Sequence, residues 1–220
     1  MKKGFHVGVA ATGMVLPSKC YTNDDVIAEI NKATEGRDDV PELNSKWIEE
    51  NIWIKTRYYF SEDETMLDVS TKAVNQALLK AGWDPLELDF VILSSTSTRS
   101  DKCSSAIPSL ACRVQEKLKA YNAFAYDTAA ACSGWVYAAS QAIAFIESGV
   151  AQKGAVICVE KQRVGLDYSN HRSSILIGDV AAATLFEKQV EPKITSLYMR
   201  ANDEKNLSNI IRLPFHRYED

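Results

Sequence analysis

The 220-residue chain has no run of apolar residues long enough to span a lipid bilayer and no secretory signal peptide. Its five cysteines form no Cys-x-x-Cys pair; they are Cys20, Cys103, Cys112, Cys132 and Cys158. An odd number of cysteines without paired spacing does not predict a disulfide framework. We therefore expect a cytoplasmic protein whose thiols are reduced.

The chain also lacks an excess of basic residues. Its 25 Lys and Arg residues stand against 29 Asp and Glu residues, which gives a net charge of -4. Binding to nucleic acid requires clustered cations, so no nucleic-acid partner is expected. No metal-ligand spacing and no glycine-rich phosphate-binding loop are found, so the sequence predicts neither a metal site nor a flavodoxin-like binding module.

What the sequence does contain is an alternation of short apolar runs and amphipathic helical patterns. The runs 90–93, 123–126 and 155–159 are continuous, as in parallel strands covered by helices on both faces. Helices are expected between them, over 104–119 and 132–148. This β-α-β-α-β succession predicts an α/β layered domain.

Further elements are predicted on both sides of this core. Thr22 or Asn23 would cap a helix that continues through Ile30, and Gly82 would end a helix over 64–81. The remaining expected elements are a short helix over 47–52 and strands over 5–11, 181–186 and 194–199.

Cys132 lies where a strand of small residues turns into a helix, within Asp127-Thr-Ala-Ala-Ala-Cys-Ser-Gly-Trp135. The unpaired N–H groups and the dipole at the first turn of a helix favour a negative charge. The thiolate is the nucleophilic form of cysteine. Cys132 is therefore a candidate nucleophile, and the alternative is a buried cysteine that serves only in packing.

The segment around Cys132 resembles the Asp-x-x-x-Ala-Cys-Ser/Ala-Gly-Phe/Trp motif of the β-ketoacyl-ACP synthase III family, within the thiolase superfold. Other segments resemble the same family in the same order along the chain. They are 7–17 with Tyr21-Thr-Asn23, Trp47-Ile48 with 54–57, 90–98, 107–115, and 174–183.

The resemblance implies a thiolase-like α/β fold with a mixed, mostly parallel sheet and helices on its faces. Residues 1–187 would form the N-terminal half, and 188–220 would begin the connection to an absent second half. In the family, that second half contributes a histidine and an asparagine to condensation. His6, His171 and His216 match neither motif, so we expect the activity to be incomplete without a C-terminal half.

The resemblance also implies an activity. Cys132 would accept an acyl group from acyl-CoA or acyl-ACP for condensation with malonyl-ACP in fatty acid or polyketide biosynthesis. No cofactor is implied beyond the coenzyme A or phosphopantetheine thioester that serves as substrate. The implied partners are acyl carrier protein, acyl-CoA, and either a second copy in a homodimer or a C-terminal-half chain.

Three further site residues follow from the resemblance. Trp47 matches a tryptophan that stacks near the adenine end of coenzyme A, and Ile107 matches an apolar residue that reaches the partner's acyl pocket in the dimer. A family arginine aligns with His171, and the adjacent Arg172 would substitute for it. Asn51 replaces a second family arginine, which weakens the expected contacts with nucleotide phosphates.

Two alternatives remain open. The chain could be a non-catalytic partner subunit of a split or heteromeric condensing enzyme. It could also be similar to hydroxymethylglutaryl-CoA synthase, which shares the cysteine but fits the pattern around Gly178 less well. Asp179, next to that glycine, is predicted to be a structural hydrogen-bond acceptor.

Overall fold

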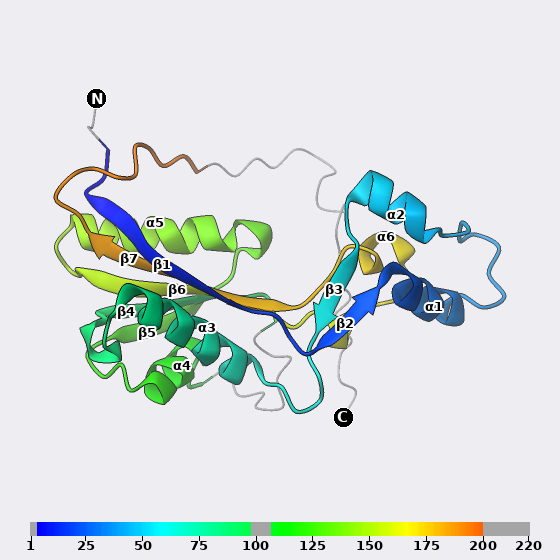
Figure 1. The fold of residues 1–220 in the computed structure, drawn as a ribbon, viewed down its shortest axis with the longest axis horizontal. Coiled ribbons are helices and arrows are strands. Elements are labelled where there is room, and N and C mark those ends of the chain that lie inside the picture. The colour runs from blue at the N-terminus through cyan, green and yellow to red at the C-terminus, as the bar shows by residue number, and fades with distance from the viewer. Residues whose placement is uncertain (1–3, 98–106, 200–220) are drawn as a thin grey trace. The chain divides into compact units, whose positions relative to one another are not determined.

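The computed structural model describes residues 4–97 and 107–199, and these form two compact units (Figure 1). The first unit contains residues 4–15, 64–97, 107–160 and 180–199. The second unit contains residues 16–63 and 161–179. Both units therefore draw on the predicted segment 1–187. The boundary of that segment with 188–220 stays a prediction.

The first unit is built on a five-stranded sheet in the order β1-β7-β6-β4-β5 (Figure 1). The strands are β1 (Val7–Val15), β7 (Val180–Lys188), β6 (Lys153–Glu160), β4 (Phe90–Ser94) and β5 (Phe124–Thr128). β6, β4 and β5 pair in parallel, and β7 is antiparallel to both of its neighbours. β7 alone runs against the other four strands, which confirms the mixed, mostly parallel sheet.

Helices cover both faces of this sheet. α5 (Gly134–Glu147) lies on one face, and α3 (Met66–Ala81) and α4 (Leu110–Leu118) lie on the other (Figure 1). The interior strand β4 is buried at every position because α4 and α5 pack on it from opposite sides. Apolar residues of β4, β6, β7 and α5 form the core between sheet and helix, among them Phe90, Ile92, Ala138, Ile143, Val156 and Phe186.

β5 differs from the prediction of a buried strand. It occupies one edge of the sheet, none of its residues is fully buried, and the Phe124 side chain is 40% exposed. The apolar run of β5 is similar to that of β4. Only the order of the strands in the sheet decides that β4 has a neighbouring strand on each side and that β5 has one on one side.

The two ends of the described chain also depart from the prediction. The first strand runs from Val7 to Val15, four residues further than expected. The strand predicted for 194–199 does not form. Only Ile194 makes a bridge, accepting a hydrogen bond from the Phe5 N–H at 2.7 Å.

Helix ends follow the local sequence. Thr22 caps α1 (Asn23–Ala33) and forms a reciprocal capping box with Asp25. Thr65 caps α3, and Gly82 ends that helix at φ +69°, a left-handed conformation that glycine adopts without steric penalty. These ends confirm the predictions for both helices.

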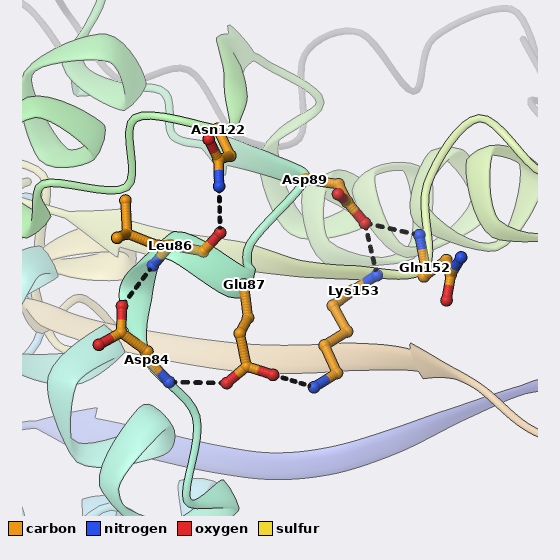
Figure 2. A network of polar contacts seen from close by, with 7 residues as sticks. All are labelled: Asp84, Leu86, Glu87, Asp89, Asn122, Gln152 and Lys153. Atoms are coloured by element: carbon orange, nitrogen blue, oxygen red, sulfur yellow. Dashed lines mark hydrogen bonds and ion pairs between the residues drawn. The ribbon is translucent and has the colours of Figure 1, made fainter.

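A polar network joins the starts of β4 and β6 (Figure 2). The Asp89 carboxylate accepts hydrogen bonds from the N–H groups of Gln152 and Lys153 at 2.7 and 3.0 Å. Glu87 accepts from the Asp84 N–H and forms an ion pair with the Lys153 ammonium. The turn Pro85–Glu87 that leads into β4 is thereby tied to the amino end of β6.

The second unit is smaller and contains a two-stranded antiparallel sheet, β2 (Lys19–Thr22) with β3 (Thr56–Tyr59). Three helices accompany it: α1, α2 (Ser45–Ile52) and α6 (His171–Ser174). Its core contains Val26, Ile30, Ile48 and Ile175. Neither strand was predicted, because neither four-residue segment alternates apolar and polar residues.

Candidate active site

Cys132 lies on the 3₁₀ turn Ala131–Ser133 that joins β5 to α5 in the first unit. Ser133 is the N-cap residue and α5 begins at Gly134, two residues later than predicted. The Cys132 side chain is exposed. We expect a cysteine that serves only in packing to be buried, so the exposure of Cys132 favours its role as a nucleophile.

The turn that carries Cys132 is strained. Ala131 has φ +45°, in the left-handed region that residues with a side chain rarely adopt. Such a residue costs about 1–3 kcal/mol and persists only where the surrounding structure fixes it, commonly at functional sites. Within the turn itself, the Ser133 N–H donates to the Ala130 carbonyl at 3.0 Å.

The first residue of α5 is packed directly against the end of β4. A Cβ atom placed on Gly134 would lie 2.1 Å from the Ser94 Oγ and 3.2 Å from the Ser94 Cβ. Ser94 is itself buried. Glycine therefore allows the helix that follows Cys132 to approach the sheet closely.

On the other side of the turn, the end of β5 is held by the loop after β4. The Ser95 N–H donates to the Thr128 carbonyl at 3.1 Å. The Glu160 carboxylate, at the end of β6, accepts hydrogen bonds from the Thr96 N–H at 2.8 Å and from the Ser97 hydroxyl at 2.6 Å. Glu160 could not be predicted as a site residue from the sequence, because only the parallel pairing of β4 with β6 brings it to this loop.

Asp127, at the start of the Cys132 motif, has a structural role that the sequence did not reveal. Its carboxylate accepts hydrogen bonds from the N–H groups of Leu110 and Ala111 at 3.0 and 2.7 Å. These groups belong to the first turn of α4, where a negative charge is favoured. Asp127 therefore joins α4 to the strand that leads to Cys132.

Two other cysteines in the described part of the first unit differ from Cys132, and Cys103 lies outside the described residues. Cys112 and Cys158 are both partly buried. Burial raises the pKa of the Cys158 thiol to about 11, and the nearby Glu160 adds to that effect. Cys158 is thus a neutral thiol at physiological pH, as expected of a cysteine that serves in packing.

The remaining predicted site residues are distributed over both units. Ile107 is 83% exposed and lies just before α4 in the first unit. Trp47, 52% exposed on α2, and Arg172, exposed on α6, belong to the second unit. Their roles stay predictions, and His216 lies outside the described residues.

Within the second unit, Asp179 has the structural role predicted for it. Its side chain is 3% exposed and its carboxylate accepts hydrogen bonds from the N–H groups of Phe60, Gln162 and Arg163. Burial raises the pKa of Asp179 above its ordinary value of 3.8, and the three N–H donors act in the opposite direction. Asp179 connects β3 with the segment that follows residue 160.

We expect this raised pKa to affect stability. As the pH rises from 3.8 through the folded-state pKa, the unfolded chain releases the Asp179 proton before the folded chain does. The free energy of unfolding therefore falls over this range. Urea unfolding of the wild type and of Asp179→Asn from about pH 3.5 to about pH 7 measures it. The stability of the wild type relative to the variant should decrease with pH, and an increase would contradict the assignment.

Neither a metal site nor a membrane-spanning helix is found among the described residues. In residues 4–97 and 107–199, no group of three or more His, Cys, Asp or Glu residues is placed to hold a metal ion. No helix of the described chain combines the length and apolarity needed to cross a membrane.

Comparison with known proteins places the Cys132 segment in a family. The sequence model of 3-oxoacyl-[acyl-carrier-protein] synthase III matches residues 126–203. A β-ketoacyl-[acyl-carrier-protein] synthase III from Actinobacillus succinogenes is 34% identical over 212 residues, which are 96% of this chain. Because the match covers 61% of that relative, the chain spans about three fifths of its length.

Solved structures agree with this assignment. The 3-oxoacyl-[acyl-carrier-protein] synthase III from Aquifex aeolicus superimposes with a TM-score of 0.72 at 33% identity, covering 84% of this chain and 55% of that one. The priming β-ketosynthase of the R1128 polyketide pathway also gives 0.72, at 27% identity, covering 86% of this chain and 52% of that one. The fold is therefore thiolase-like.

Proposed function

We propose that this chain is an acyltransferase of the β-ketoacyl-ACP synthase III family and that its nucleophile is Cys132. The observation that carries the proposal is the exposed cysteine on a strained turn immediately before α5. A strained, accessible turn at the start of a helix is a suitable place for a nucleophile.

The proposed step is a transfer between thioesters. The Cys132 thiolate attacks the carbonyl carbon of an acyl thioester, and the negative charge passes to the carbonyl oxygen. Collapse of this intermediate breaks the bond to the sulfur of coenzyme A or phosphopantetheine, and that sulfur leaves as a thiolate which takes up a proton. The product is an acyl group bound to Cys132.

The donor would be acyl-CoA or acyl-ACP, and the acyl group would then condense with malonyl-ACP. The named relatives, a β-ketoacyl-ACP synthase III and a polyketide priming ketosynthase, support a place in fatty acid or polyketide biosynthesis. Trp47 and Arg172 would contact coenzyme A, Ile107 would limit the acyl pocket, and no cofactor is proposed. We also propose that the protein acts in the cytoplasm.

Condensation would require groups from a C-terminal half, and we propose that the chain pairs either with a C-terminal-half chain or with a second copy in a homodimer. A homodimer is supported by β5, whose outer edge has no neighbouring strand among the described residues. Its backbone N–H and C=O groups are available to pair with another strand.

Mass spectrometry of the intact 220-residue chain tests the acyl transfer. After incubation with acetyl-CoA or acetyl-ACP, the wild type should gain one acetyl group, located on the peptide that contains Cys132. Cys132→Ser should gain none. Cys20→Ser is the matched control, because Cys20 is also exposed but lies in the second unit, and it should be labelled like the wild type.

Absence of the adduct in a folded wild-type chain would contradict the proposal. It would favour the non-catalytic partner subunit, whose contribution to the active site would then come only in a complex.

A further inference from the structure

One segment, here called the 94–97 loop, contacts the chain around the Cys132 turn; it comprises Ser94, the last residue of β4, and the three residues that follow. The loop contacts the chain on both sides of Cys132. Ser95 donates its N–H to Thr128, at the end of β5, and Ser94 packs against Gly134, at the start of α5. The left-handed Ala131 between these two contacts needs such external support.

The conformation of the 94–97 loop depends in turn on Glu160. One carboxylate oxygen accepts the Thr96 N–H at 2.8 Å, and the other accepts the hydroxyls of Thr96 and Ser97 at 3.0 and 2.6 Å. Ser95 adds a longer contact with that oxygen at 3.5 Å. Hydrogen bonds to an ionised carboxylate are about twice as strong as neutral ones, so a single side chain fixes most of the loop.

We infer that Glu160 is a positioning residue for Cys132. It acts through the 94–97 loop, which holds the end of β5 and the start of α5 at the separation that the strained turn requires. Glu160 contacts neither the substrate nor the Cys132 sulfur in this assignment. The expected effect of Glu160 on the acylation rate of Cys132 rests on the proposed function. The expected effect of Glu160 on the conformation of the Cys132 turn does not.

The structure offers a matched control at the opposite end of β4. Asp89 also uses its carboxylate to hold a segment of the first unit, through the N–H groups of Gln152 and Lys153 (Figure 2). It lies just before β4, whereas the 94–97 loop begins at the carboxyl end of that strand. Asp89→Asn should therefore weaken the same sheet without releasing the Cys132 turn.

The test compares Glu160→Ala, Glu160→Gln and Asp89→Asn in the full chain. Hydrogen exchange of peptides covering 128–134 should become faster in Glu160→Ala and remain as in the wild type in Asp89→Asn. The acetylation rate constant of Cys132 at saturating acetyl-CoA should fall about 10- to 100-fold in Glu160→Ala, the scale of losing a supporting contact. The half-saturating concentration of acetyl-CoA should not change.

Glu160→Gln is the conservative variant, because its side-chain amide retains one oxygen that can accept the Thr96 N–H. It should fall between the wild type and Glu160→Ala, and it serves as the test if the alanine variant does not fold. Unchanged exchange at 128–134 in a folded Glu160 variant would overturn the inference, as would an equal slowing of acetylation by Asp89→Asn. Faster exchange confined to the turn would support the inference even if the wild type accepts no acetyl group, an outcome that would refute only the proposed function.

Discussion

Gly134→Ala is expected to slow the acylation of Cys132 by about 100-fold, because displacing a reacting group by about 1 Å can cost that much. The new methyl group would lie 2.1 Å from the Ser94 Oγ and 3.2 Å from the Ser94 Cβ, and because Ser94 is buried we expect α5 and the turn before it to move away from β4. Overpacking of this kind also lowers the free energy of unfolding by about 1–3 kcal/mol. The acylation rate and the urea midpoint of the variant measure the two effects.

A double variant tests whether the contact with Ser94 causes the slower acylation of Gly134→Ala. Ser94→Gly removes both side-chain atoms that the new methyl group would meet, the Oγ and the Cβ at 3.2 Å. The double variant Ser94→Gly/Gly134→Ala should therefore recover much of the acylation rate lost in Gly134→Ala, a coupling that a double-mutant cycle measures. If Gly134→Ala acylates at the wild-type rate, the close approach of α5 to β4 does not position Cys132.

Gly13→Ala is expected to destabilise the first unit by about 3 kcal/mol, the upper part of the usual range for overpacking. A Cβ atom at this position of β1 would lie 2.0 Å from the Ala73 carbonyl oxygen and 3.0 Å from the Ala77 nitrogen, both in the backbone of α3. Backbone atoms in the middle of a helix cannot turn aside as a side chain can. Thermal and urea unfolding of the full chain measure the loss.

Gly8→Ala is the control for this prediction, since Gly8 lies on the same strand. The three atoms nearest to its new methyl group would all belong to the side chain of Gln189, the first at 2.9 Å, and that flexible side chain can shift. The control should lose less than about 1 kcal/mol. Equal losses in the two variants would show that the close approach of β1 to α3 is not the cause.

Local chemistry allowed much of the fold to be predicted from the sequence. Thr22 and Gly82 mark helix ends through side-chain capping and a left-handed φ, and both signals lie within a few residues of the feature that they predict. The apolar run of β4 predicted a strand buried on both faces. The same prediction for the similar run of β5 was wrong, because β5 lies at the edge of the sheet. An edge position depends on which strands pair and not on the residues of the strand.

The candidate site divides in the same way. Cys132 could be selected from the sequence, because a strand-to-helix junction and the motif around it are local patterns. Glu160 could not, because it is 28 residues from Cys132 and meets the 94–97 loop only after β4 and β6 pair in parallel. The contact between Gly134 and Ser94 is likewise a consequence of packing α5 onto the sheet.

By itself, the sequence determined the α/β alternation, the helix ends at Thr22 and Gly82, the resemblance to the β-ketoacyl-ACP synthase III family and the choice of Cys132 as candidate nucleophile, since each depends on residues close together in the chain or on a motif. The tertiary structure alone decided the edge position of β5, the exposure of Cys132, the left-handed Ala131 and the contacts that support the turn. The physical reason is that hydrogen bonds and close packing between distant segments exist only once the strands have paired and the helices have packed on them.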